Sequence, residues 1–160
     1  MTAGHLIRAN FAAVRTELAE TFPHLTDDML EWAPVPGMHT IRRLFMDIMT
    51  TEQSILERLR GLPRSTDEEL DAPYLSIKTV AGLLEKMAAV RDDTLGYLDT
   101  LDEAELAGPS PHWKSWSDGL QLNPTPVSEV LRYIARHEYY HAGQLFTYLW
   151  MRGDDPYAWD

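Results

Sequence analysis

Apolar residues recur along the chain at the three- and four-residue spacing of amphipathic helices. This spacing predicts four helices, over residues 5–22, 40–59, 76–101 and 125–153. No stretch between them shows the alternation typical of a half-buried strand. The pattern therefore predicts an all-α protein, a four-helix up-and-down bundle formed as a single domain by residues 1–160.

The segments between the predicted helices contain residues that interrupt helices. Two prolines and a glycine predict an irregular connection over 26–40, with one short turn near 27–30. The acidic run 67–71 is predicted to be a solvated loop. Residues 108–124 combine glycines and prolines with Trp113 and Trp116, so they are predicted to form a loop that either covers a functional site or plugs the bundle end.

Composition limits the classes of function. Lysine and arginine number 14 against 25 aspartates and glutamates, a net charge of −11, which disfavours binding to nucleic acid. Cysteine is absent, so histidine, carboxylate and hydroxyl groups must carry any chemistry. Neither a secretory leader nor a long apolar run is apparent, and we expect a cytoplasmic protein without a membrane span.

The fourth predicted helix carries the clearest chemical signal. His137 and His141 are four residues apart, so both rings leave the same side of the helix, and both fall on its apolar face. Two inward histidines at this spacing can share one metal ion. Alternatively, they are core histidines satisfied by hydrogen bonds.

The same run spells His-Glu-x-x-His, the helix motif of zinc peptidases, in which Glu138 would be the general base. Such enzymes usually take a third ligand from downstream, where only Asp154, Asp155 and Asp160 are available as carboxylates. Glu138 is also rotated by about 60° from His141 around the helix. We therefore expect little peptidase activity, with Glu138 acting instead as a buried carboxylate that supports the metal ligands or as the partner of an arginine on another helix.

The second predicted helix supplies two further candidate ligands. Asp47 lies at the edge of its apolar face, and Glu52 lies near the middle of that face. A carboxylate facing a core needs a cation or a hydrogen-bonding partner. The alternatives are a surface position for Asp47 and a buried salt bridge from Glu52 to Arg43 or Arg91. Two histidines and one carboxylate would suit iron, zinc or nickel.

The chain resembles the DinB superfamily, including its YfiT-like thiol-dependent branch. The resemblance covers residues 30–52 and 125–156, and its most specific part is the run His-x-x-x-His-x-Gly-Gln over 137–144. It implies a four-helix bundle, often a homodimer, that holds a divalent metal with three histidines. Asp47 occupies the position of the first of these histidines, so the implied ligands are Asp47, His137 and His141, with Glu52 as an alternative carboxylate.

The resemblance also implies a class of reaction. Characterised relatives use a low-molecular-weight thiol such as bacillithiol, mycothiol or glutathione, and transfer it to an electrophile or isomerise maleylpyruvate. We therefore expect a transferase or hydrolase acting on a small-molecule substrate. A zinc peptidase and a non-catalytic binding or stress protein remain the alternatives.

Two features of the fourth predicted helix bear on the surroundings of the site. Gln144 lies close to His141 and is expected either to support a bound ligand or to satisfy backbone groups. Tyr139, Phe146 and Trp150 form a second apolar stripe, which neighbouring segments or a second copy of the chain would cover.

Overall fold

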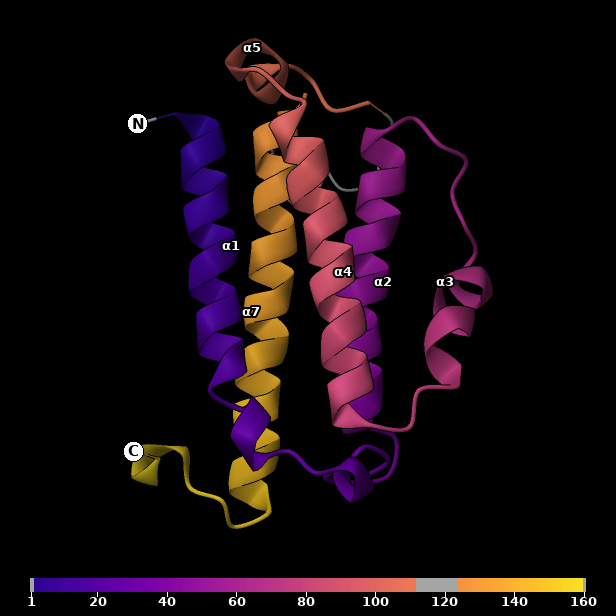
Figure 1. Cartoon of the computed structure of the whole chain (residues 1–160), viewed down its shortest axis with the longest axis vertical. Coiled ribbons are helices and arrows are strands. Elements are labelled where there is room, and N and C mark those ends of the chain that lie inside the picture. The colour runs from indigo at the N-terminus through magenta and orange to yellow at the C-terminus, as the bar shows by residue number, and fades with distance from the viewer. Residues whose placement is uncertain (1, 112–123, 160) are drawn as a thin grey trace.

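The structure is a computed structural model that describes residues 2–111 and 124–159. Four long helices lie alongside one another within these residues, and two shorter helices, α3 (Asp67–Leu75) and α5 (Glu103–Ala107), lie outside them (Figure 1). The long helices are α1 (Ala3–Ala19), α2 (Ile41–Leu59), α4 (Val80–Asp99) and α7 (Val127–Met151). In the described residues the regular structure is helical apart from one isolated bridge, between Pro109 and Pro126, so the prediction of an all-α protein is confirmed.

Side-chain caps explain where several helices begin. The Thr40 hydroxyl accepts from the Arg43 backbone N–H, which starts α2 where it was predicted. Thr79 caps α4 in the same way, so this helix begins later than the predicted Ser76. The last helix was predicted to begin at residue 125, and α7 begins just after Pro126, without a side-chain cap.

The acidic run 67–71 is helical, so its prediction as a solvated loop was wrong. It forms the start of α3 (Asp67–Leu75), where Thr66 and Glu69 make a reciprocal capping box. Acidic side chains in a first turn also favour the positive end of a helix. A second short helix, α5 (Glu103–Ala107), was not predicted and carries the same kind of cap. The short turn near 27–30 is confirmed as a 3-10 turn, Asp27–Met29.

The directions of the long helices differ from the predicted alternation of up and down. Near their first turns, Arg42 of α2 donates to the Ile77 carbonyl just before α4. Near their last turns, Arg60 of α2 forms an ion pair with Asp93 of α4 at 2.7 Å. Contacts that join start to start and end to end mean that α2 and α4 run in the same direction. Residues 60–79, which include α3, link the end of α2 to the start of α4 and run back along the outside of the bundle (Figure 1).

The apolar core is divided into two clusters by a polar layer. One cluster gathers the beginnings of α1 and α7 and the ends of α2 and α4, and the other gathers the opposite ends. Between them, each long helix contributes one charged residue: Arg15, Glu52, Arg91 and Glu138. These charges, of which Arg15 is only partly buried, therefore lie at mid-height in the bundle, level with the histidine pair.

The chain's C-terminal segment covers part of the second apolar stripe of α7. The Trp159 ring stacks on Phe146 with centroids 5.4 Å apart, and Tyr157 meets Trp150 edge-on. Tyr139 and Trp150 stay about half exposed, at 53% each. The predicted covering role of Trp113 and Trp116 concerns residues outside those described. None of the described helices is long and apolar enough to cross a membrane.

Candidate metal centre

Three possible metal ligands from two helices converge near the middle of the bundle. Asp47 comes from α2, and His137 and His141 come from successive turns of the antiparallel α7. His141 Nε2 lies 3.2 Å from Asp47 Oδ2 and 3.3 Å from His137 Nε2. One ligand atom from each residue lies within 4.8 Å of the others. The structure thus brings together the three residues that the family resemblance selected.

Gln144 orients the His141 ring through a contact with its Nδ1 atom. The Gln144 side-chain oxygen lies 2.7 Å from His141 Nδ1, and its amide nitrogen donates to the Tyr140 hydroxyl at 3.1 Å. Because an amide oxygen only accepts, this contact is a hydrogen bond when Nδ1 carries the proton. In the neutral ring, Nε2 therefore presents its lone pair to Asp47 and His137, as a metal ligand must.

Electrostatics favours neutral histidine and ionised aspartate at the site. Burial, helped by the neighbouring His141, lowers the pKa of His137 from 6.5 to about 4. The adjacent His141 ring lowers the pKa of Asp47, against the opposing effect of its partial burial. At neutral pH the site therefore presents an uncharged His137 ring and an anionic Asp47 carboxylate.

This donor set fits a cation. Since His141 Nε2 presents a lone pair, His137 can donate a hydrogen bond to it. The same lone pair then faces an oxygen of the Asp47 carboxylate, with no proton between the two atoms. Either an added proton on His141 or a metal ion among the three groups satisfies both contacts. Two imidazoles and a carboxylate are ligands that zinc, nickel and iron all accept.

The other two candidate carboxylates lie outside this centre. Glu52 is 1% exposed and makes two hydrogen bonds with Arg91, at 2.8 and 2.9 Å. Glu138 is equally buried and contacts Arg15 at 2.6 Å and Arg91 at 2.5 Å. The predicted salt bridge of Glu52 to an arginine and the predicted interhelical arginine partner of Glu138 are both present. Neither carboxylate is available to a metal held by the histidines.

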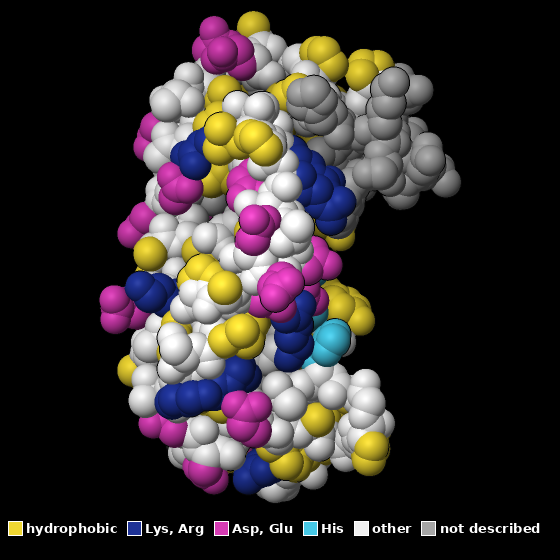
Figure 2. Space-filling model, turned by 90° about the vertical axis from the view of Figure 1, so that its right-hand side faces the viewer, with side chains coloured by type: hydrophobic (Ala, Val, Ile, Leu, Met, Phe, Trp, Pro, Cys, Tyr) yellow, Lys and Arg dark blue, Asp and Glu magenta, His cyan; other side chains and the backbone are white. Residues whose placement is uncertain are grey.

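The centre opens into a pocket of about 620 Å³. Besides the cluster and Gln144, its described walls include Tyr133, Tyr140, Arg136 and His39. Figure 2 shows a histidine surface at the edge of a hollow, with basic and acidic side chains beside it. Tyr133 was not among the predicted site residues, although it lies one turn before His137 on the same face of the helix. Its ring stacks beside His137 with centroids 6.1 Å apart.

Fold and site together define an all-helical protein with a two-histidine, one-carboxylate cluster at the side of a bundle. The family model of the DinB superfamily matches residues 10–145, and the chain belongs to this superfamily. The chain is also similar to a solved structure described as a conserved protein from Enterococcus faecalis. The TM-score is 0.64 at 18% identity, over 94% of this chain and 97% of that one. This likeness concerns the fold alone. No match to a curated protein is found.

Proposed function

We propose that the protein is a metal-dependent enzyme that transfers a low-molecular-weight thiol to a small electrophile, or hydrolyses such an electrophile. Asp47, His137 and His141 would hold a divalent zinc, nickel or iron ion. The observation that carries the proposal is the convergence of these three ligands beside an open pocket. A structural metal site is usually closed by four protein ligands, whereas three ligands beside a pocket leave a position for a substrate.

Each residue of the proposed site would have a distinct role. His137 and His141 bind through neutral nitrogens, Asp47 supplies a negative charge, and Gln144 holds the His141 ring in its tautomer. A bound divalent ion would lower the pKa of a thiol or water, so that sulfur or oxygen could attack at neutral pH. Tyr133 and Tyr140 offer aromatic walls beside the two histidines for an apolar part of the substrate.

The geometry does not support a peptidase. The general base of that mechanism must reach the water beside the metal. The Glu138 carboxylate instead accepts hydrogen bonds from Arg15 and Arg91, and it is 1% exposed. Cleaving a peptide with this glutamate would require breaking a buried charge network.

Metal analysis of protein purified without a nickel column tests the metal site. We expect about one divalent ion per chain, as other three-ligand catalytic sites hold. The ion should be lost in His137→Ala and His141→Ala. His39→Ala is the matched control, because His39 is exposed and lines the same pocket outside the ligand cluster. Equal metal content in the wild type and His137→Ala would overturn the assignment.

Activity is tested with glutathione or bacillithiol and 1-chloro-2,4-dinitrobenzene. In this reaction a sulfur–carbon bond forms, chloride leaves with the electron pair of the carbon–chlorine bond, and the thiol proton passes to solvent. We expect turnover that depends on the added metal and on His141 but not on His39. A metal-loaded protein that turned over neither this substrate nor a panel of ester and epoxide electrophiles would favour the non-catalytic binding protein.

A further inference from the structure

Tyr140 lies at the wall of the pocket into which the candidate metal centre opens. The residue is 61% exposed, and its ring meets the His141 ring edge-on, with centroids 5.2 Å apart. A molecule that enters the pocket therefore meets the Tyr140 side chain next to one of the candidate ligands.

Gln144 connects Tyr140 with His141. Its side-chain oxygen faces His141 Nδ1 at 2.7 Å, and its amide nitrogen donates to the Tyr140 hydroxyl oxygen at 3.1 Å. The oxygen and the nitrogen of one amide point in different directions, so an amide that accepts from the ring must present its N–H groups elsewhere. The side chain that orients His141 thus also determines the partner of the Tyr140 oxygen.

The Tyr140 hydroxyl is left with a proton to donate. A phenol has one O–H donor and an oxygen that accepts, whereas an amide nitrogen only donates, so the proton cannot point at Gln144. Within residues 2–111 and 124–159, the contact with Gln144 is the one hydrogen bond that this hydroxyl makes. Towards the pocket, Tyr140 is therefore a hydrogen-bond donor.

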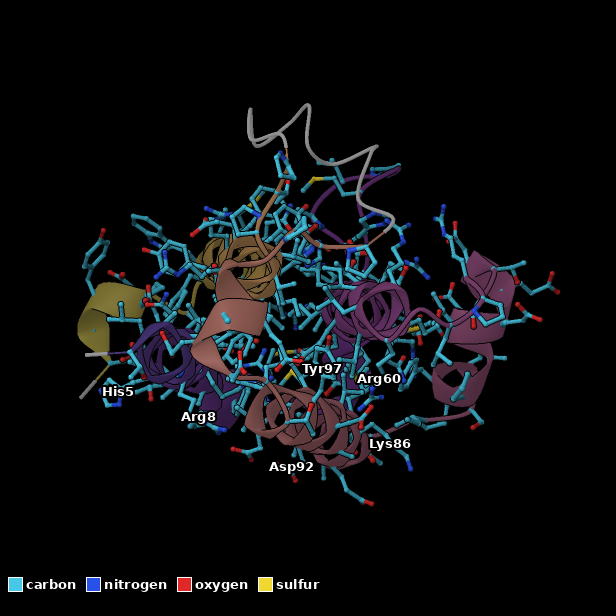
Figure 3. The ribbon with its side chains drawn as sticks, turned by 90° about the horizontal axis from the view of Figure 1, so that it is seen from above. His5, Arg8, Arg60, Lys86, Asp92 and Tyr97 are labelled. Carbon is cyan, nitrogen blue, oxygen red and sulfur yellow. The ribbon has the colours of Figure 1, made fainter. Side chains whose placement is uncertain are left out.

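The pocket takes its described walls mainly from two neighbouring helices, α2 and α7. Seen from above, α4 with its Lys86 and Asp92 lies across the bundle from α7 (Figure 3). These two charged side chains are thus on the opposite side of the molecule. A ligand in the pocket therefore finds its hydrogen-bonding partners chiefly on α2 and α7.

Arg136 is a second hydrogen-bond donor among the described wall residues. Its guanidinium lies 3.7 Å from the Glu129 carboxylate, so it already has a partner of opposite charge. The Tyr140 proton has no such competitor among the described residues. An oxygen atom of a bound molecule is therefore more readily served by Tyr140.

We propose that Tyr140 is a specificity-determining residue, whose hydroxyl donates a hydrogen bond to an oxygen atom of the molecule bound at the metal. Tyr140 keeps its proton throughout. This inference rests on the proposed function and narrows its substrate class to small molecules with a carbonyl, ester or similar acceptor oxygen a few bonds from the atom that the metal holds. A ligand without this oxygen leaves the exposed hydroxyl to water, so the expected preference is modest.

Two neutral thiols of the same length test this hydrogen bond in the cobalt-loaded protein. Methyl 3-mercaptopropionate carries an ester carbonyl near its sulfur, and 1-pentanethiol has methylene groups in its place. The charge-transfer absorption of the cobalt–sulfur bond reports thiolate binding. In Tyr140→Phe, we expect the Kd of the ester to rise about fivefold, as for the loss of a neutral hydrogen bond, and the Kd of 1-pentanethiol to change less than about twofold.

Tyr139→Phe is the matched control, because it removes a tyrosine hydroxyl from the adjacent residue. Tyr139 is 53% exposed and lines another hollow, between α1 and α7. We expect this variant to keep the wild-type ratio of the two affinities. Arg136→Gln tests the rival donor. Weaker ester binding in Arg136→Gln with none in Tyr140→Phe would assign the hydrogen bond to Arg136 and overturn the proposal.

Gln144→Glu offers a second, independent test. Both oxygens of a carboxylate accept, so this variant can accept from His141 Nδ1 and also from the Tyr140 hydroxyl. We expect it to bind cobalt but to lose the preference for the ester, as Tyr140→Phe does. A full preference for the ester in Gln144→Glu would show that the direction of the Tyr140 proton does not select the ligand.

The cobalt titration separates this inference from the proposed function. If the wild type did not bind cobalt, the proposed function and the role of Tyr140 would both be overturned. If cobalt bound but neither thiol did, the metal site would stand, and the thiol chemistry and the role of Tyr140 would be contradicted. If both thiols bound with the same affinity ratio in the wild type and in Tyr140→Phe, the role of Tyr140 alone would be overturned.

Discussion

His137 and Glu138 are neighbours on α7, yet their side chains enter two polar clusters of opposite character. Glu138 joins Arg15, Arg91 and Glu52 in a buried network with two positive and two negative groups. His137 joins Asp47 and His141, a carboxylate and two imidazole rings whose ligand atoms lie within 4.8 Å of one another. The charges of the first cluster cancel within the protein, whereas the second cluster needs a proton or a bound cation.

The comparison distinguishes polar groups that stabilise the fold from polar groups that can bind a ligand. In the network, the Arg91 guanidinium also lies over the Phe11 ring at 4.2 Å, so it is held from several sides. Buried charges that pair with one another hold the helices in register and are not available for reaction. The cluster of Asp47 and the histidines is partly open and depends on a proton or a metal. The balance of charge therefore explains why the motif glutamate is structural while the motif histidines are the candidate ligands.

The largest expected effect comes from breaking the balanced network. Arg91→Met leaves Glu52 and Glu138 buried without their shared partner, and we expect the free energy of unfolding to fall by about 3–5 kcal/mol. Arg60→Met, which breaks a more exposed ion pair of the same two helices, should cost only about 0–1 kcal/mol. Denaturant unfolding measures both. Similar losses in the two variants would contradict the structural role of the network.

Zinc should stabilise the protein through the other cluster. At a free zinc concentration of about 100 times the Kd, binding to the folded state adds about 2.7 kcal/mol. We expect Glu138→Gln to lower the stability of the metal-free protein but to retain this increment, and His137→Ala to abolish it. Thermal or denaturant unfolding with and without zinc gives the comparison. If zinc no longer stabilised Glu138→Gln, the two clusters would have to be regarded as one functional unit.

The pH dependence of stability should report on His137. Its pKa is about 4 in the folded protein and 6.5 in the free side chain. Between these values the unfolded chain takes up a proton that the folded chain does not, so stability is complete above about pH 6.5 and falls as the pH is lowered towards 4. We expect this to contribute about 1–3 kcal/mol in the metal-free protein. His137→Gln should flatten this part of the profile, and an unchanged slope would contradict the burial of a neutral ring.

The smallest expected effect concerns Gln144. Gln144→Met removes the acceptor for the His141 Nδ1 proton, and zinc affinity should fall about tenfold, the lower end for residues that orient a metal-binding histidine. Gln144→Glu keeps an acceptor at that position and should largely restore affinity. Competition with a zinc chelator measures both variants. Loss of affinity in Gln144→Glu as large as in Gln144→Met would show that the hydrogen bond does not orient the ring.

Much of the local structure could be predicted because it depends on neighbours in the chain. The Thr40 cap, the extent of α2 and the shared face of His137 and His141 all follow from helical periodicity and capping chemistry. The start of α3 was also readable, since Thr66 and Glu69 have the spacing of a capping box. Because the segment is strongly acidic, it was instead predicted to be a solvated loop.

By itself, the sequence determined the helices, their apolar faces and the pair of histidines, since each of these is set within a few turns of one helix. The tertiary structure decided between the two carboxylates of α2, because the register of the helices places Asp47 opposite His141 and Glu52 opposite Arg91. It also decided that α2 and α4 run in the same direction and that Glu138 meets arginines from two other helices. These contacts join residues far apart in the chain, and the periodicity of a single helix holds no information about which partner it will face.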